Sequence, residues 1–247
     1  MKKTYFISDA HLGIESQQKE ELKQRRLIQF FKAIEADADQ LFIVGDLFDF
    51  WIDYHWVIPR RYLPILSALR ELSAFGVKVS IIAGNHDFWL GNFFTHDMNI
   101  AIHNKPLDLT LHGKRFYIAH GDGLNRKDFG YRFLKFILRN PVTYTTCRLL
   151  HPDVTFAVAR WCSTLSRGQR PDFDIQEPYI EHARELFMKG YDCVIFAHTH
   201  NPIKLNENQH TYINIGEWMN MCTYAVYNQG KLDLKIWKGP KPKGESV

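Results

Sequence analysis

The sequence contains little cysteine and no long uninterrupted hydrophobic run. Four cysteines in 247 residues are too few for a disulfide framework, and they lack the close spacing of a zinc site or redox motif. The apolar stretch near the N-terminus is interrupted by Ser8 and Asp9, too early for a secretory signal or a membrane span. We therefore expect a cytoplasmic protein with buried structural thiols. The cysteines are Cys147, Cys162, Cys193 and Cys222.

The net charge is also small. The 31 Lys and Arg residues against 27 Asp and Glu give +4, which is too mild to indicate nucleic-acid binding by itself. A hydrophobic fraction of 45% and a charged fraction of 23% exclude disorder and a coiled coil. At roughly 150 residues per domain, we expect a single domain over residues 1–240 with a helical cap insertion at about 125–170, followed by a disordered tail at 241–247.

Short apolar or β-branched runs alternate with helical patterns in the first half of the sequence. Helical spacing covers residues 19–36 and 62–75, and Gly76 is placed to end the second helix. This order predicts an α/β fold. The last three predicted strands are expected to be antiparallel, with a turn at residues 228–230 between the final two. The predicted strands are residues 4–8, 41–44, 77–83, 115–119, 193–197, 211–215, 223–227 and 232–237.

A polar cluster follows each of the first five predicted strands. Side chains at the carboxyl ends of neighbouring strands converge on one crevice, which is where α/β proteins bind ligands. We therefore expect the five clusters to form one site. The clusters are Asp9-Ala10-His11, Gly45-Asp46, Gly84-Asn85-His86-Asp87, His120-Gly121-Asp122 and His198-Thr199-His200.

The residue types in these clusters favour a metal site. Carboxylates, an amide oxygen and imidazoles without cysteine suit Mn²⁺, Fe²⁺ or Zn²⁺ and exclude a copper or iron–sulfur centre. Seven groups on one ion would leave no open position for chemistry, so two ions that share a bridging carboxylate are predicted. Taken singly, each cluster is as easily a turn, a helix cap or a structural histidine. The seven groups are Asp9, His11, Asp46, Asn85, His120, His198 and His200.

This ordered set resembles the calcineurin-like metallophosphoesterase superfamily over residues 4–218. The resemblance implies an α/β sandwich of two mixed sheets flanked by helices, and a dinuclear metal-dependent hydrolase. It also implies that His86 contacts the scissile phosphate and assists the leaving group, and that Asp87 orients His86. The implied ligands are Asp9, His11, bridging Asp46 and His200 for the first metal, and Asp46, Asn85, His120 and His198 for the second.

The predicted insertion concentrates the positive charge of the chain. Residues 125–170 carry nine basic residues against Asp128 and Asp153, a net charge of +7. Aromatic and aliphatic residues lie between them, a composition that suits an anionic amphiphile at a membrane surface. The alternative is a packing face with solvated arginines, while nucleic acid, a third possibility, is not the expected partner. The basic residues are Arg126, Lys127, Arg132, Lys135, Arg139, Arg148, Arg160, Arg167 and Arg170.

Residues 8–13, 44–51 and 120–124 resemble the family of UDP-2,3-diacylglucosamine hydrolases of lipid A biosynthesis, and residues 128–132 add an Asp and a Tyr that this family carries near its substrate. The resemblance implies water attack on the α-phosphorus, release of UMP and 2,3-diacylglucosamine 1-phosphate, and activation by Mn²⁺. It also implies that cap helices hold the acyl chains and that the protein is peripheral on the inner membrane. The expected substrate contacts are Asn85, His86, Asp128, Tyr131, Arg132, Arg148 and Arg160.

One position departs from that family. His86 stands where the best-characterised lipid A hydrolases carry arginine, and histidine, unlike arginine, can donate a proton to a leaving group. The substrate therefore stays open between the UDP-linked acyl sugar and another nucleotide diphosphate, a phosphodiester or a phosphoprotein. A non-enzymatic interaction module on the same fold is a further hypothesis. The sequence does not fix the native metal or the oligomeric state.

Overall fold

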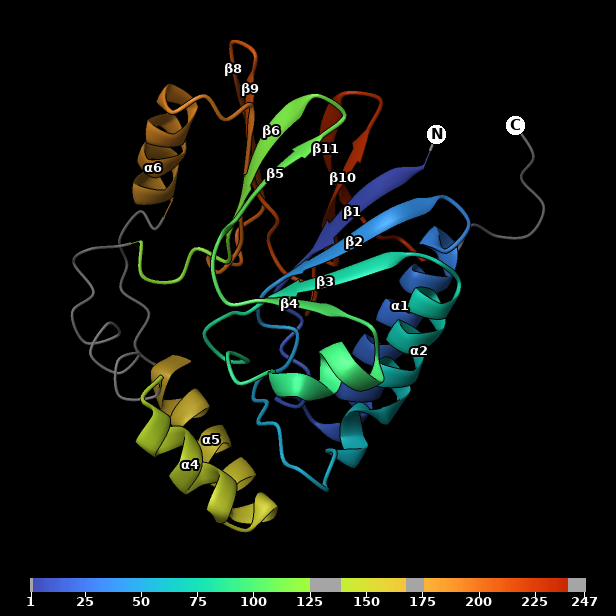
Figure 1. The fold of residues 1–247 in the computed structure, drawn as a ribbon, viewed down its shortest axis with the longest axis vertical. Coiled ribbons are helices and arrows are strands. Elements are labelled where there is room, and N and C mark those ends of the chain that lie inside the picture. The colour runs from blue at the N-terminus through green and yellow to red at the C-terminus, as the bar shows by residue number, and fades with distance from the viewer. Residues whose placement is uncertain (1, 125–138, 168–175, 240–247) are drawn as a thin grey trace.

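Two mixed β-sheets pack against each other, with helices on their outer sides (Figure 1). The computed structural model describes residues 2–124, 139–167 and 176–239. The predicted fold class, an α/β sandwich of two mixed sheets flanked by helices, is confirmed.

The first sheet has six strands in the order β11-β10-β1-β2-β3-β4. Strands β1 to β4 are parallel, whereas β10 is antiparallel to β1 and β11 is antiparallel to β10. The carboxyl ends of β1, β2 and β3 therefore lie at the same edge of the sheet. The strands are β1 (Lys3–Ile7), β2 (Ala38–Val44), β3 (Lys78–Ile82), β4 (Ala101–His103), β10 (Thr223–Asn228) and β11 (Lys231–Ile236).

The second sheet has five strands in the order β5-β6-β7-β9-β8, of which β6, β7 and β9 are parallel. The strand predicted at 211–215 corresponds to β9, and its expected antiparallel pairing with the last two strands was wrong. Because β8 forms an antiparallel hairpin with β9, β9 returns parallel to β7. Strands β10 and β11 do pair antiparallel, around the predicted turn at residues 228–230. The strands are β5 (Leu107–Leu111), β6 (Lys114–Ile118), β7 (Cys193–Phe196), β8 (Ile203–Glu207) and β9 (His210–Asn214).

The core between the sheets consists of buried apolar side chains from both. Phe6 of β1 stacks on Phe42 of β2 with ring centroids 5.4 Å apart, and it lies 6.4 Å from Phe116 of β6. Successive residues of a strand face opposite sides, so the neighbouring Tyr5 packs on Phe30 of helix α1 instead. These ring contacts hold β1 and β2 of the first sheet against β6 of the second sheet.

Helices α1 (Gln17–Ile34) and α2 (Leu63–Ala74) flank the first sheet, and α6 (Glu177–Met188) packs on the second. The predicted helices at 19–36 and 62–75 are confirmed, and Gly76 follows α2 at a φ of 102°. Helix α6 and the short strands β4, β5 and β8 were not predicted from the sequence. The buried face of α1 has helical spacing and includes Leu27, Phe30, Phe31 and Ile34.

Helices α4 (Pro141–Leu149) and α5 (Pro152–Arg167) form an antiparallel pair on one side of the molecule (Figure 1), which we call the cap. Phe156 of α5 meets Phe50 at 5.1 Å, and Tyr144 of α4 meets Trp89 at 5.5 Å. Helical structure is thus present within the predicted insertion. The remainder of the insertion and the predicted tail at 241–247 lie outside the described residues.

All four cysteines are free thiols. Cys193 and Cys222 are buried as predicted, but Cys147 is half-buried and Cys162 is exposed. The expectation of burial fails for these two because they lie on cap helices that are open to solvent on one side. Within residues 2–124, 139–167 and 176–239, no helix combines the length and the apolar character needed to span a bilayer.

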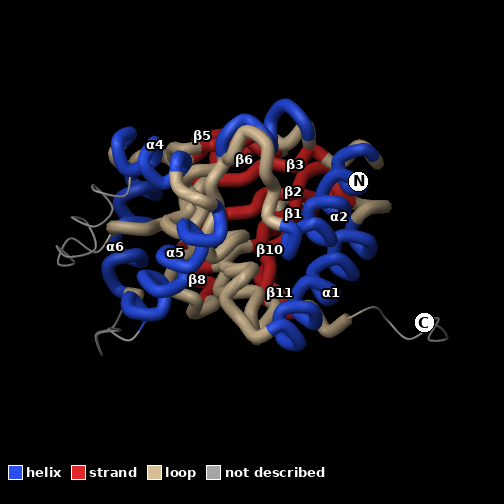
Figure 2. The backbone as a smooth tube through the Cα atoms, turned by 90° about the horizontal axis from the view of Figure 1, so that it is seen from below, coloured by secondary structure: helices blue, strands red, loops and turns tan. Residues whose placement is uncertain are grey.

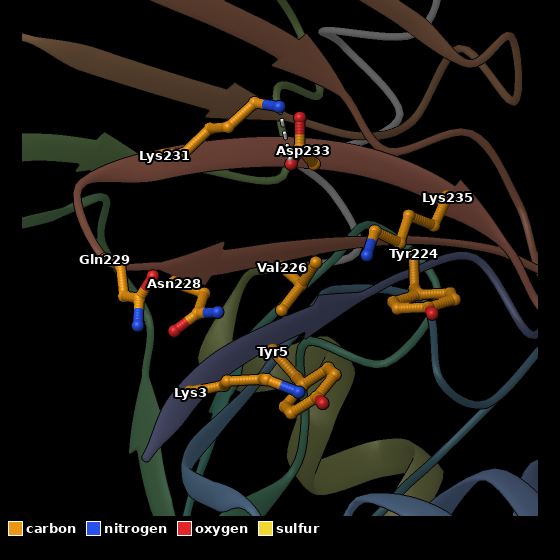
Figure 3. Close-up of a pocket in the computed structure, with 9 residues that line it drawn as sticks. All are labelled: Lys3, Tyr5, Tyr224, Val226, Asn228, Gln229, Lys231, Asp233 and Lys235. Atoms are coloured by element: carbon orange, nitrogen blue, oxygen red, sulfur yellow. Dashed lines mark ion pairs between the residues drawn. The ribbon is translucent and has the colours of Figure 1, made fainter. Parts of the chain in front are cut away.

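A pocket of about 380 Å³ is formed by β1 and the β10–β11 hairpin (Figure 3). Lys3 and Tyr5 line it from β1, and Lys231 pairs with Asp233 at 3.4 Å on β11. None of its lining residues belongs to the five polar clusters. The candidate site therefore lies elsewhere.

Candidate metal centre

The predicted clusters come together at one edge of the molecule, in loops that Figure 2 shows in front of the strands. The residues are Asp9 and His11 after β1, Asp46 after β2, Asn85 after β3, His120 after β6, and His198 and His200 after β7. Strands β1 to β3 belong to the first sheet and β6 and β7 to the second. Both sheets therefore contribute to the site.

Five of these residues have a left-handed backbone, a conformation that non-glycine residues seldom adopt and that Asp, Asn and His tolerate better than most. The φ angles are 50° at Asp9, 41° at His11, 54° at Asp46, 69° at His198 and 58° at His200. Hydrogen bonds between the loops hold them, including those from the Asp9 amide to the Gly45 carbonyl at 3.1 Å and from the His11 amide to the Asp46 carbonyl at 2.9 Å. Such clustered backbone strain is typical of functional sites.

Two glycines make room for the site. A Cβ atom on Gly84 would overlap Oδ1 of Asp46, and one on Gly45 would overlap the imidazole of His120. Gly84 needs no unusual φ, so the close approach of Asp46, through both its carboxylate and its backbone nitrogen, accounts for glycine there. The glycines of these two motifs therefore allow the polar side chains to pack directly against the backbone.

Asp9, His11 and His200 form a first group, whose candidate ligand atoms lie within 4.8 Å of one another. Nε2 of His200 is 3.1 Å from Oδ1 of Asp9 and 3.1 Å from Nε2 of His11. Asp9 and His11 are fully buried, and His200 is half-buried. Three nitrogen and oxygen donors at this spacing can hold one divalent cation.

Asp46, His120 and His198 form a second group of the same kind. Nε2 of His120 is 3.2 Å from Nδ1 of His198 and 3.0 Å from Oδ1 of Asn85. The amide oxygen of Asn85 therefore joins the second group.

Asp46 lies between the two groups. Its Oδ2 atom is 3.6 Å from Nε2 of His11 in the first group and 3.3 Å from Nε2 of His120 in the second. Its other oxygen, Oδ1, accepts a hydrogen bond from the backbone amide of His86 at 2.9 Å. One carboxylate thus faces both groups, as a bridging ligand must.

The buried carboxylates attract positive charge. Burial opposes a charged imidazole, yet the neighbouring carboxylates raise the pKa of His11 to about 9 and that of His120 to about 10. Burial also opposes ionisation of Asp46, but His120 and His86 hold the pKa of that carboxyl well below its usual range. In addition, Oδ1 of Asp9 is buried and lies 3.1 Å from Nε2 of His200. Divalent cations fit this arrangement of donors.

Two histidines are oriented through their second ring nitrogen. Nδ1 of His120 is 2.9 Å from the carbonyl oxygen of Val44, so it donates there and presents Nε2 to the site. Nδ1 of His11 is 3.5 Å from Oδ1 of Asp49. These contacts fix the tautomers that metal coordination requires.

Asp49 is a further site residue that was not predicted from the sequence. Nδ1 of His86 is 3.0 Å from the carbonyl oxygen and 3.5 Å from Oδ1 of Asp49, so this residue orients both His86 and His11. Its position three residues after Asp46, in the same loop after β2, was the signal available in the sequence.

Asp87 has a different task from the predicted one of orienting His86. Its carboxylate accepts hydrogen bonds of 2.8 to 3.3 Å from four backbone amides, because its side chain is directed into the core below the loop. Burial and the charge of Asp46 raise the pKa of Asp87 to about 6. Asp87 therefore braces the loops that carry Asp46 and His86. The amides belong to Asp46, Leu47, Phe48 and Gly84.

An arginine reaches the site from within the predicted insertion. Nη2 of Arg139 is 3.3 Å from the carbonyl oxygen of Gly84 and 3.7 Å from Oδ2 of Asp122. Arg139 was predicted only as one of the basic residues of the insertion, not as a site residue. Arg148 on α4 and Arg160 on α5 are exposed. Three other predicted substrate residues, Asp128, Tyr131 and Arg132, lie outside the described residues.

The chain is similar in sequence to a known protein family and to several named proteins. The profile described as calcineurin-like phosphoesterase matches residues 2–202. A UDP-2,3-diacylglucosamine hydrolase from Porphyromonas gingivalis is 31% identical, with 94% of this chain and 97% of that protein aligned. Proteins of the same name from Nitrosococcus oceani and Pseudomonas fluorescens are 31% and 29% identical, over 87% and 86% of each chain.

Among solved structures, an archaeal phosphodiesterase aligns with 95% of this chain and 99% of its own at a TM-score of 0.45 and 15% identity. This structural likeness is too weak to carry an argument.

Proposed function

The chain belongs to the calcineurin-like phosphoesterase family, and on that premise we propose that it cleaves the pyrophosphate of UDP-2,3-diacylglucosamine. The products would be UMP and 2,3-diacylglucosamine 1-phosphate, in lipid A biosynthesis. The chain is a metal-dependent hydrolase. The observation that carries the proposal is the gathering of all seven donor groups around the bridging position of Asp46. The choice of substrate is supported by relatives of that name that align over most of the chain.

We assign the donors to two divalent cations. Two such cations, when bound, lower the pKa of a water molecule and neutralise charge on the phosphoryl group. The donors are carboxylate, amide and imidazole groups without a thiolate, which suit Mn²⁺, Fe²⁺ and Zn²⁺. Among these we propose Mn²⁺, the metal that the resemblance to the lipid A hydrolases implies. The ligands would be Asp9, His11, Asp46 and His200 for the first cation and Asp46, Asn85, His120 and His198 for the second.

His86 is the proposed proton donor to the leaving group. Its Nδ1 faces Asp49, which assigns Nε2 to the substrate. Its ring meets that of His11 edge-on, with centroids 4.7 Å apart, so the donor stands beside the first group. Asn85 and His86 would both contact the scissile phosphate.

Recognition of the rest of the substrate is assigned to the insertion. Asp128, Tyr131 and Arg132 would contact the sugar nucleotide, and Arg148 and Arg160 would attract its phosphates. Arg139 supplies a further guanidinium next to the loop of Gly84.

We also propose that the cap side of the protein meets the inner membrane peripherally. Leu149 and Trp161 expose 83% and 65% of their surface on the cap, and Trp56 exposes 89% on the loop after β2. The loop lies beside the cap, because the hydroxyl of Tyr54 donates to the carbonyl of Cys147 at 3.4 Å. Arg60 and Arg61 follow the loop and suit an anionic surface.

Vesicle binding tests the membrane contact. Replacing Trp56 with Ser should reduce sedimentation with vesicles of phosphatidylethanolamine and phosphatidylglycerol, without changing hydrolysis of a small chromogenic diester. Met188→Ser is the control, because Met188 is 81% exposed on α6, away from the cap. Equal vesicle binding by both variants would contradict the proposed contact.

Release of UMP tests the main proposal. The purified protein is incubated with UDP-2,3-diacylglucosamine in mixed micelles with Mn²⁺, beside a chromogenic diester. We expect UMP release that is lost on chelation and in Asp46→Ala but kept in Asp97→Ala, a change at an exposed position.

Diester cleavage without UMP release would indicate that the substrate is another nucleotide diphosphate, a phosphodiester or a phosphoprotein. Absence of any hydrolysis and of bound metal would instead favour an interaction module on this fold.

A further inference from the structure

The carboxylate of Asp49 lies between the metal centre and the cap. Its Oδ1 atom is 3.5 Å from Nδ1 of His11, 3.5 Å from Nδ1 of His86 and 3.1 Å from the hydroxyl oxygen of Ser163 on α5. The side chain of Asp49 is only 3% exposed, so no bulk water competes for this oxygen. One atom therefore connects a cap helix to two site histidines.

Ser163 occupies an inward position on α5. It is 7% exposed, while the preceding Trp161 and Cys162 are open to solvent. Thr155, eight residues earlier on the same face, is also buried, but its hydroxyl donates within the cap, to the carbonyl of Cys147 at 3.1 Å. The Ser163 hydroxyl instead crosses to a carboxylate 114 residues away in sequence.

This contact constrains Asp49 in a way that apolar packing would not. A hydroxyl donating to a buried carboxylate makes a charge-assisted hydrogen bond, which is stronger and more directional than a neutral one. The backbone of Asp49 is held already, since its amide donates to Leu12 at 2.9 Å and its carbonyl faces Nδ1 of His86 at 3.0 Å. The hydrogen bond from Ser163 helps to set the rotation of the carboxylate about its side chain.

We propose that Ser163 is a positioning residue through which the seated cap holds the Asp49 carboxylate in the orientation that aims His11 and His86. Cap seating then contributes to the chemical step itself, in addition to substrate recognition. This inference rests on the proposed function only in assigning His11 and His86 to phosphoester chemistry.

A small chromogenic diester separates positioning from recognition, because it has no acyl chains or sugar for the cap to bind. With bound Mn²⁺, Ser163→Ala should lower kcat on this diester roughly tenfold, as loss of such supporting contacts commonly does, with KM unchanged. Ser163→Cys, which fills the same space with a weak donor, should lose a similar amount. Thr145→Ala is the control, since the Thr145 hydroxyl donates to the carbonyl of Pro141 within α4 at 2.9 Å.

A double mutant completes the test. In an Asp49→Asn background, Ser163→Ala should produce no further loss of kcat. Full diester activity in Ser163→Cys, or an effect of Ser163→Ala confined to KM for the lipid substrate, would overturn the inference. Because the readout is diester hydrolysis, failure of wild-type UMP release would refute the proposed substrate and leave this comparison intact.

Discussion

The metal centre and the cap differ in how their side chains are held. Site residues such as Asp9, Asp46 and His120 are buried, follow strands of both sheets and have backbones fixed by hydrogen bonds. The cap exposes large apolar side chains such as Leu149, and rests on the body through ring contacts such as that of Phe156 with Phe50. We therefore propose that the strand ends of the two sheets determine the chemistry, whereas the surface of the two cap helices adapts the molecule to its substrate.

The largest expected effect belongs to the residue that faces both ligand groups. Asp46→Ala should lower kcat on lipid substrate and diester alike, by roughly a hundredfold or more, because both cations lose a ligand. Metal content measured on the purified variant should fall below that of the wild type. Full metal content with normal turnover would show that Asp46 is not shared.

Gly84→Ala tests the framework through its backbone. A Cβ atom there meets the Asp46 carboxylate, so we expect roughly tenfold loss of kcat on the diester. Gly230→Ala in the β10–β11 turn, where a Cβ meets no atom within 4 Å, should lower thermal stability slightly and leave kcat unchanged. Similar activity in the two variants would contradict the close packing inferred for Gly84.

The cap side of the comparison is tested by Arg148→Ala combined with Arg160→Ala. At roughly fivefold per arginine, KM for the lipid substrate should rise, while diester hydrolysis stays unchanged. Steady-state kinetics on both substrates provides the measurement. An equal loss of activity on both substrates would indicate that these arginines take part in the chemical step, which would contradict the separate role proposed for the cap.

The smallest expected effect concerns the pH dependence of stability in the metal-free protein. The pKa of His11 is raised to about 9 and that of His120 to about 10, above the ordinary value of 6.5, so the folded state binds their protons more tightly. Their contribution to stability is complete below pH 6.5 and is lost as the pH rises through 9 to 10.

Thermal melting from pH 6.5 to 10 provides the measurement, with the metal-loaded protein as the control. Its Tm should vary less, because bound cations replace the protons. If the Tm of the metal-free and metal-loaded proteins changed equally with pH, the positive charges of the two histidines would not stabilise the buried carboxylates.

The sequence predicted the framework better than the cap, for a physical reason. Each polar cluster is covalently attached to the end of a strand, so predicting the strand also places the cluster. Asp49 was not predicted because its role depends on the rotation of its side chain toward His86 and His11, and its spacing from Asp46 in the sequence does not fix that rotation. The pairing of β9 with β7 and the contact of Ser163 with Asp49 likewise depend on how distant segments pack.

The left-handed backbone at Asp9, His11, Asp46, His198 and His200 limits how this centre can be altered. Asp, Asn, His and Gly tolerate that conformation, whereas a β-branched or bulkier residue is strained there by roughly 1 to 2 kcal/mol. Exchanging these ligands for thiolates or longer carboxylates, in order to favour a softer metal or a larger ion, would therefore encounter a conformational penalty besides any change in coordination. Redesign of metal preference has to begin with the loops rather than with the side chains.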